Sequence, residues 1–599
     1  MRKTLVRYAR LVPRARRGQW VAVVVFALIA SGLEAVGAVL VYLLVGLTTD
    51  PAASLEVPLV GDLRARLPEL APEQLITATA IGVAVFFVVR AGVKLSQSYF
   101  QARVANQTSV DIATALFARY LRLPYSFHLR RNSSELIRNA SESVNEILGS
   151  VLMPMVRLVA EGFMILGLVA VLLYTAPAAT AAVAVVLGVF VLFVLRVVQP
   201  RMGRLGAISQ REHGAGIQAL QQGLHGYRDI TVLGRQQYFE EVYRSARLKI
   251  ARARWLRAML GEFPRVAIEA LVVGLIALFL VVSTQTGGGA AESLPVLGLF
   301  AYAALRLMPS LNEVVRNLNS LRFGRAAVQD VEADLDLKLP FPVGEVARLD
   351  MREALRLEHV TFVYDGAEEP TLEDIDLMVA RGESVGVVGA TGAGKSTLTD
   401  LLLGLSVPTH GRVTVDGQDL REVAPSFQRS VGMVSQEVFL LDDTLRHNIA
   451  LGVPPSEIDE ERVAQAVGLA QLDEFVASLP EGLDTWVGER GVRVSGGQRQ
   501  RVAIARALYP DPSLLVFDEG TSALDNLTEA MLIESLEQLQ NDRTIITVAH
   551  RLSTVRDHDK IVFMRDGRID DVGSYDELGA RNPEFRRLAR WAASGAAPV

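Results

Sequence analysis

The sequence contains no cysteine, so disulfides, thiolate metal ligands and a cysteine nucleophile are all excluded. The net charge of −5 is small for 599 residues, and this balance gives no indication of nucleic acid as a partner. Apolar residues are abundant at 50% of the chain, but they are unevenly distributed. Long apolar runs dominate before about Gly324, whereas the remainder has the pattern of an ordinary globular domain. This shift predicts a membrane domain followed by a soluble domain.

Six apolar segments are long enough to cross the roughly 30 Å of hydrocarbon in a bilayer. They lie at about 20–47, 75–98, 147–175, 177–199, 262–285 and 293–318. Residues 1–17 carry only basic charges, so we expect the amino end in the cytosol, although a basic tail without topological meaning is the alternative. Residues 48–74, between the first two spans, are compatible with a short amphipathic surface helix or with a plain loop.

The connections after the second and fourth spans are long, rich in arginine and interrupted by proline or glycine near 121–136 and 224–237. This pattern predicts that the spans extend into the cytosol as helices, with a short element at each break. Simple helix–turn–helix corners are the alternative. We therefore expect a six-helix transmembrane domain at 1–324, an acidic, proline-bearing linker at 325–350, and an α/β domain at 351–599.

The strongest motif is GATGAGKS, Gly389 to Ser396, which follows a buried apolar strand and precedes a helix, as a P-loop requires. The backbone of this turn can hold phosphates, Lys395 can reach the β- and γ-phosphates of ATP, and Ser396 can bind Mg²⁺. The cofactor-binding residues expected in the turn and its helix are Gly389, Thr391, Gly392, Ala393, Gly394, Lys395, Ser396 and Thr397.

The apolar strand SLLVF ends in two carboxylates. Asp518 is predicted to hold Mg²⁺, and Glu519 is placed to orient the attacking water as a base. Alone, such a pair is often a helix cap or an ion pair, and the P-loop is what favours the functional reading. Between the two motifs, the segment that includes Ser495, Gly496, Gly497 and Gln498 opens a basic helix. Its start offers backbone donors to an anion, although it could simply cap the helix.

This ordered set of motifs resembles the ATP-binding cassette (ABC) transporters, specifically exporter-type half-transporters, over nearly the whole chain. The resemblance makes VSGGQ the signature motif, FDEG the Walker B motif and SALD, ending at Asp525, the D-loop. It further implies that Tyr364 stacks on adenine, that Gln436 senses Mg²⁺ and water, and that His550 contacts the γ-phosphate. Val487 to Gly491, VGERG, resembles the exporter loop that contacts the membrane domain.

In this family each ATP lies between the P-loop of one cassette and the signature motif of another. A chain with one cassette is therefore expected to act as a dimer, either with a second copy or with a different partner. The resemblance implies alternating access driven by ATP and Mg²⁺, with the breaks near Tyr125 and Tyr227 acting as coupling helices. We expect a multi-pass protein of the inner (cytoplasmic) membrane with its nucleotide-binding domain in the cytosol.

Three arginines fall within or beside apolar segments: Arg90, Arg265 and Arg306. Charge at membrane depth is costly, so such residues face a partner or a wet cavity. Unneutralised guanidiniums would suit a phosphate-bearing ligand, because arginine makes forked hydrogen bonds to such anions. Pairing with Glu34, Glu161 or Glu269, or snorkelling to the interface, is the alternative.

A narrower resemblance connects these arginines with a substrate. RLMPS in the sixth span, the Pro-Arg pair and glutamate of the fifth, and the arginine of the second are similar to bacterial flippases for lipid-linked oligosaccharides. The resemblance implies cavity arginines that engage a pyrophosphate. We therefore expect ATP-driven flipping or export of an amphipathic anionic substrate, with membrane lipids as surroundings. A peptide or hydrophobic-drug exporter of the same architecture is the alternative.

Overall fold

The computed structural model describes residues 11–49, 72–175, 177–285, 308–341, 344, 346–488, 491, 494–518, 543–549 and 551–594. The chain forms two compact units. The first comprises Met1–Leu123 and His128–Leu339, and the second comprises Pro124–Phe127 and Pro340–Val599. The division at 339 and 340 falls inside the segment predicted as a linker, whose first part forms a helix that belongs to the first unit.

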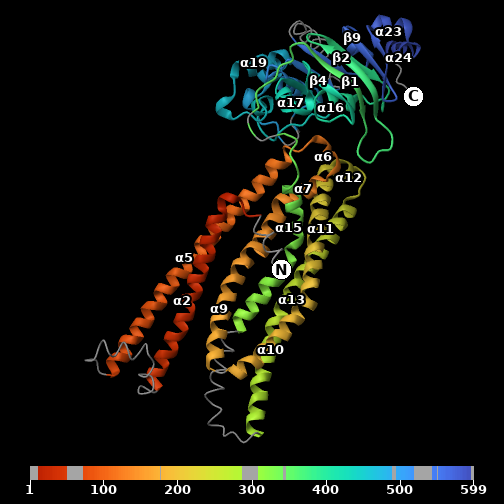
Figure 1. Cartoon of the computed structure of the whole chain (residues 1–599). Coiled ribbons are helices and arrows are strands. Elements are labelled where there is room, and N and C mark those ends of the chain that lie inside the picture. Colours follow the sequence, from red (N-terminus) through yellow and green to blue (C-terminus); the bar gives the residue numbers. More distant parts are fainter. Residues whose placement is uncertain are drawn as a thin grey trace. The chain divides into compact units, whose positions relative to one another are not determined.

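The first unit is built from long helices, seen from red to green in Figure 1. π-helical turns at Asn139–Ser143, Leu148–Leu152 and Val194–Val198 interrupt two of them, and residues 308–323 are also helical. The α-helices are α2 (Arg17–Thr49), α5 (Pro72–Tyr120), α6 (Tyr125–Arg130, which begins in the second unit), α7 (Ser133–Arg138), α8 (Val144–Ile147), α9 (Met153–Thr175), α10 (Pro177–Phe193), α11 (Gln199–His225), α12 (Tyr227–Val232), α13 (Gln236–Gln285) and α15 (Arg325–Leu335).

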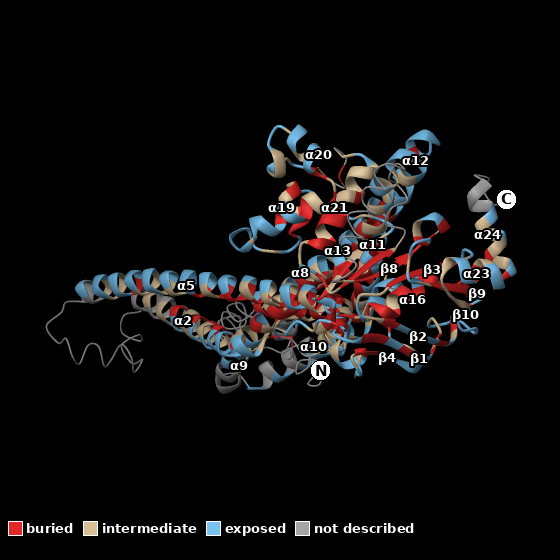
Figure 2. Cartoon of the chain, turned by 90° about the horizontal axis from the view of Figure 1, so that it is seen from above, coloured by how far each residue is buried: buried red, intermediate tan, exposed pale blue. Residues whose placement is uncertain are grey.

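Three helical stretches among the described residues are long and apolar enough to cross a membrane: Arg14–Glu34, Ile76–Tyr120 and Ser133–Gly167. Most residues in the apolar part of α5 are exposed, and Figure 2 shows much of this helix in pale blue. Val88 and Leu95, for example, are 73% and 72% exposed. Exposed apolar surface of this extent is expected where lipid is the solvent. The count of six spans remains a prediction, because most of 293–318 lies outside the described residues.

The two breaks predicted in the long connections are both present. After α5 the chain turns through Leu121–Pro124 into the short helix α6, and after α11 it turns at Gly226 into the short helix α12. Both are single short helices between long ones. The predicted short elements at 121–136 and 224–237 are therefore helical.

Gly206 allows α11 to touch the chain at Phe323. A Cβ added to Gly206 would lie 2.0 Å from the carbonyl oxygen of Phe323, a distance that no side chain accepts. The glycine is therefore required by close backbone approach and not by backbone conformation.

Gly206→Ala is expected to lower the stability of the full chain by about 1–3 kcal/mol, because α11 and Phe323 must separate. Gly223→Ala is the matched control in the same helix, since nothing lies within 4 Å of a Cβ there. Alanine at that point is expected to be neutral or slightly stabilising. Thermal unfolding in detergent measures both variants, and equal melting temperatures would contradict the close contact.

The second unit contains two sheets. One is antiparallel with strand order β2-β1-β4-β5, and the other has the order β10-β9-β3-β8-β7-β6, with all but β10 parallel. The strands are β1 (Ala354–Phe362), β2 (Leu372–Ala380), β3 (Ser384–Gly389), β4 (His410–Val415), β5 (Gln418–Asp419), β6 (Val431–Val434), β7 (Leu514–Asp518), β8 (Thr544–Val548), β9 (Lys560–Arg565) and β10 (Arg568–Gly573). The helices are α16 (Lys395–Leu402), α17 (Leu420–Gln428), α18 (Leu445–Ile449), α19 (Glu460–Leu469), α20 (Asp473–Ser478), α21 (Gly496–Leu508), α23 (Tyr575–Arg581) and α24 (Pro583–Ser594).

The parallel strands form the buried centre of this unit, drawn red in Figure 2. Val385, Val387, Val516 and Ile546 are each at most 1% exposed, as expected for strands covered on both faces. Because the carboxyl ends of parallel strands meet at one edge, the residues that follow β3, β6, β7 and β8 converge there. The fold thereby positions the predicted nucleotide site.

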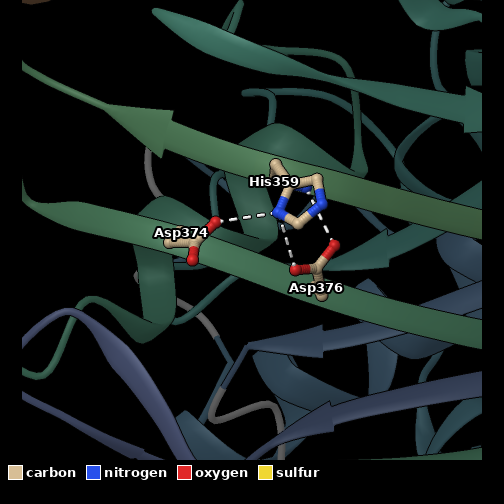
Figure 3. A group of neighbouring side chains, drawn as sticks. All are labelled: His359, Asp374 and Asp376. Atoms are coloured by element: carbon tan, nitrogen blue, oxygen red, sulfur yellow. Dashed lines mark hydrogen bonds and ion pairs between the residues drawn. The ribbon is translucent and has the colours of Figure 1, made fainter.

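His359 connects two strands of the antiparallel sheet at an irregular point. Its Nδ1 lies 2.9 Å from Asp374 Oδ1 and 3.1 Å from Asp376 Oδ2 (Figure 3). The backbone N–H of His359 donates to Asp376 as well, at 2.9 Å. Its hydrogen bond to Asp374 and the negative charge of both aspartates raise the pKa of the exposed imidazole. The group joins β1 to β2 where their register shifts.

The pKa of His558 is shifted in the opposite direction to that of His359. Its Nε2 lies 2.9 Å from the Thr547 hydroxyl, and burial lowers the pKa of the imidazole to about 4. Since unfolding restores a pKa of about 6.5, the unfolded chain binds the proton first as the pH falls. The stability that the neutral ring supports is present above about pH 6.5 and is lost progressively towards pH 4.

We expect the loss of folding stability from His558, between about pH 6.5 and about pH 4, to reach about 2–3 kcal/mol. The melting temperature of the wild type should therefore fall more steeply than that of His558→Gln between about pH 7 and about pH 5. Parallel curves for the two proteins would contradict the assignment.

Candidate functional site

The predicted phosphate loop has the backbone that phosphate binding requires. It leaves β3 at Gly389 and enters α16 at Lys395, with Gly392 and Gly394 at φ values of 86° and 93°. A Cβ on Gly389 would lie 2.3 Å from the carbonyl oxygen of Met564, so this glycine packs directly on β9. Gly394 caps α16 without any side-chain hydrogen bond, which leaves the first N–H groups of the helix available for an anion.

The Lys395 side chain folds back onto carbonyl oxygens of the phosphate loop. Its ammonium donates to the carbonyl oxygens of Gly389 at 2.9 Å and Ala390 at 3.1 Å, and the residue is 6% exposed. A buried ammonium held by neutral carbonyls is poised to bind an anion of higher charge. This geometry matches the role that the motif predicts for the lysine.

Tyr364 lies beside the first turn of α16. Its hydroxyl is 3.0 Å from that of Thr397, and its ring meets Phe362 edge to face with 4.9 Å between centroids. The structure thus brings the predicted adenine-stacking residue close to the phosphate loop. The side chain is only partly buried, so part of its surface is open to a base.

Asp518 ends the buried strand β7, next to β8. Asp400, from α16, faces it closely enough that burial and the charge of Asp518 raise the pKa of Asp400 to about 6. Two carboxylates beside a phosphate loop, with the Ser396 hydroxyl at the start of α16, form an oxygen-rich set that suits Mg²⁺. Sequence reasoning missed Asp400. The available signal was an acidic residue one turn beyond the motif, on a helix that otherwise buries apolar residues.

The signature segment is folded as a helix cap. The Ser495 side chain accepts from the Gln498 backbone N–H at 3.2 Å, and the Gln498 side chain accepts from the Ser495 N–H at 2.8 Å. The capping alternative from the sequence is therefore what the single chain adopts, and Gly496 and Gly497 form the first turn of α21. A capping box satisfies only some of the N–H groups at the start of a helix, so capping and anion binding are compatible.

Of the remaining predicted nucleotide residues, the structure describes Gln436 alone. Gln436 is exposed two residues after β6, the strand beside β7, so the sheet places it at the same edge as Asp518. Glu519, Asp525 and His550 lie outside the described residues. Their roles remain predictions.

The membrane arginines are not the unneutralised set that the sequence suggested. Arg90 pairs with Glu34 at 3.1 Å, and Lys94 lies 3.7 Å from the same carboxylate. Arg265 lies 3.6 Å from Glu262, with both side chains about two-thirds exposed. Arg306 lies outside the described residues. For Arg90 the structure therefore has the alternative that the sequence left open, pairing with Glu34. The place of Arg265 and Arg306 in a substrate site remains a prediction.

Glu161 of α9 is a polar feature whose role the sequence left open. Its Oε2 is buried and has no hydrogen-bond partner among the residues that the structure describes. Further charges follow on the helical segment 308–323, where Glu313 lies 3.6 Å from Arg157 and also contacts Arg316. Polar and charged side chains therefore lie on α9 and on the segment 308–323, with Glu313 mostly buried between two exposed arginines.

Comparison with known proteins matches both parts of the chain. Residues 20–304 match the family described as ABC transporter transmembrane region, and residues 372–522 match the family described as ABC transporter. The chain is 33% identical over 514 residues to the ATP-dependent lipid A-core flippase of Thiobacillus denitrificans, covering 84% of this chain and 86% of that one. It is 30% identical over 518 residues to the protein of the same name from Nitrosococcus oceani, covering 86% of each.

A solved structure is similar over almost the full length. The structure of a bacterial Atm1-family ABC exporter with ATP bound aligns with a TM-score of 0.81, covers 98% of this chain and 100% of the other, and is 24% identical. At that identity the similarity establishes the exporter fold.

Proposed function

Because the chain belongs to the ABC transporter family, whose ATPase domain couples ATP hydrolysis to transport across a membrane, we propose that it flips an anionic, lipid-linked substrate by alternating access. The substrate class that we favour is a lipid-linked oligosaccharide with a phosphate or pyrophosphate. Such a substrate would be handled in the inner (cytoplasmic) membrane, with the ATPase domain in the cytosol.

One observation carries the coupling part of this proposal. Pro124–Phe127, from the connection after α5, belongs to the same compact unit as the ATPase domain. Within that unit, burial and the proximity of Asp400 and Tyr364 raise the pKa of Tyr125. A helix of the membrane-domain connection thus lies beside residues of the nucleotide site, as a coupling helix must.

The nucleotide roles follow from the described geometry and the motifs. Lys395 and the first N–H groups of α16 would hold the β- and γ-phosphates, with Tyr364 against the base. Ser396 and Asp518 would hold Mg²⁺, which supplies charge neutralisation at the phosphates, and Gln436 would sense it. Glu519 would act as the base, with His550 and Asp525 completing the site.

Dimerisation is supported by the second break. The residues around α12 expose four apolar side chains, each at least 66% exposed: Leu224, Tyr227, Val232 and Leu233. Short helices with exposed apolar tips are typical of docking elements. We propose that α12 contacts the ATPase domain of a second copy, whose Ser495–Gln498 segment completes the ATP site. A heterodimer would use the same surfaces.

A lipid substrate is supported by the relatives, which carry the name lipid A-core flippase. Within this chain, Arg306 remains the arginine proposed for the substrate phosphate, while Arg90 and Arg265 would contribute only by exchanging their carboxylate partners. This neutralisation favours the second candidate, an exporter of neutral or cationic amphiphiles such as hydrophobic drugs or peptides.

ATPase stimulation of the reconstituted full chain distinguishes the two candidates. We expect a polyprenyl-pyrophosphate sugar to stimulate the wild type and to lose most of this effect in Arg306→Ala. Arg316→Ala, a half-exposed arginine ten positions further along, is the matched control and should respond normally. Stimulation by peptides or cationic amphiphiles that survives removal of all three arginines would support the second candidate instead.

A further inference from the structure

The first unit contains a cavity of about 470 Å³ at the start of α11. This volume lies within the range of sites that bind small molecules. One wall is α11, with Leu195 just before it, and the other is the chain from Arg322 into α15. The two helices pack against each other (Figure 1). All lining residues belong to the first unit.

The cavity is strongly basic. Arg204, Arg322 and Arg325 line it, and in the described part of the chain no carboxylate pairs with any of them. Arg322 Nε donates to Gln199 Oε1 at 3.0 Å, which orients this guanidinium, and Gln329 adds a second amide to the wall.

Other arginines of the same unit do pair with carboxylates. Arg131 pairs with Asp334, Arg138 with Asp330 and Arg257 with Glu146. Carboxylates are therefore plentiful around α15 and the π-helical turns, yet none of the described ones pairs with a cavity arginine. Three guanidiniums collected without counter-charge form a site for an anion, since arginine recognises phosphate by forked hydrogen bonds.

One apolar residue of the lining, Leu195, indicates where the cavity lies along the predicted fourth span. Leu195 belongs to the apolar run 177–199, which the sequence predicts as the fourth span, and the arginines follow that run on its cytosolic side. Basic pockets at the cytosolic ends of membrane helices suit anionic lipid headgroups, with the acyl chains towards the apolar side.

We propose that this cavity binds the phosphate headgroup of an anionic membrane phospholipid. The assignment is independent of the transported substrate, because none of the cavity residues is among those proposed to hold it. The lipid would lie between α11 and α15, the helix that leads to the ATPase domain. Its occupancy would therefore stabilise the packing of these two helices.

Native mass spectrometry of the detergent-solubilised full chain tests the proposal. Phosphatidylglycerol is titrated against the wild type, with phosphatidylcholine as the zwitterionic comparison. Each charge removed is expected to weaken phosphatidylglycerol binding about fivefold. The triple variant Arg204→Gln, Arg322→Gln, Arg325→Gln should bind it no better than phosphatidylcholine, and each single variant should show its own fivefold loss if the triple variant fails to fold.

Arg211→Gln is the matched control, an exposed arginine of α11 seven positions beyond Arg204 and outside the cavity lining; it should bind like the wild type. Unchanged phosphatidylglycerol binding in the arginine variants would overturn the proposal. Displacement of the lipid by inorganic phosphate at the same concentration would overturn it too, since the site would then be one for free phosphate.

Discussion

Glu519→Gln is expected to lower ATP turnover by about 10²–10⁴-fold while ATP binding persists. Glutamine preserves the shape of the side chain but cannot accept a proton from the attacking water. The groups proposed to bind phosphate belong to another segment, the loop from Gly389 to Lys395. ATPase assays and equilibrium binding of a fluorescent ATP analogue to the reconstituted full chain measure the two properties separately.

Lys395→Ala is the comparison variant, because it is expected to affect ATP binding as well as hydrolysis. Loss of the buried ammonium removes the charge that we propose faces the phosphates, so binding and hydrolysis should fall together. Full hydrolysis retained by Glu519→Gln would refute the assignment of the base. Loss of ATP binding in that variant would move Glu519 from the chemistry to nucleotide binding.

Asp334→Ala is expected to destabilise the full chain by about 3–5 kcal/mol. Asp334 of α15 is fully buried and accepts three hydrogen bonds: from the Tyr120 hydroxyl at 2.5 Å, from Arg131 at 2.7 Å and from Asn139 at 2.7 Å. Removing the carboxylate takes this acceptor from the Tyr120 hydroxyl and the Asn139 amide in a mostly buried place, while Arg131 keeps its contact with Glu135.

The measurement is thermal unfolding in detergent, with Asp336→Ala as the control. Asp336 is exposed at the end of α15, and its replacement should change stability by at most about 0.5 kcal/mol. Asp334→Asn, which keeps an acceptor but loses the charge, should fall between the two. If Asp334→Ala and Asp336→Ala melt together, the buried network contributes no net stability.

The nucleotide site was predictable because its chemistry restricts the sequence. A phosphate loop needs glycine at Gly392 and Gly394, where φ is positive, a strand before it and a helix after it, and all of these are visible in the residues. The parallel sheet then brings Asp518 to the same edge. Asp400 was not predictable in this way, because its role arises from proximity and no motif marks it.

The partners of the membrane arginines, in contrast, could not be predicted from the sequence. An apolar run reveals the depth of a charge but not which face of the helix carries it. Arg90 meets Glu34 only because α2 and α5 pack side by side, and these residues are far apart in sequence. The Asp334 network likewise joins α5, the bend between α6 and α7, a π-helical turn and α15 through contacts that no local pattern encodes. Such pairs depend on tertiary packing alone.

The most direct test of the account is ATP-driven movement of a lipid-linked oligosaccharide across proteoliposome membranes that contain the full chain alone. We predict movement of a polyprenyl-pyrophosphate sugar by the wild type in the presence of ATP and Mg²⁺, and none by Glu519→Gln. Movement that is equal in both proteins, or transport of a peptide in place of the lipid, would contradict the account.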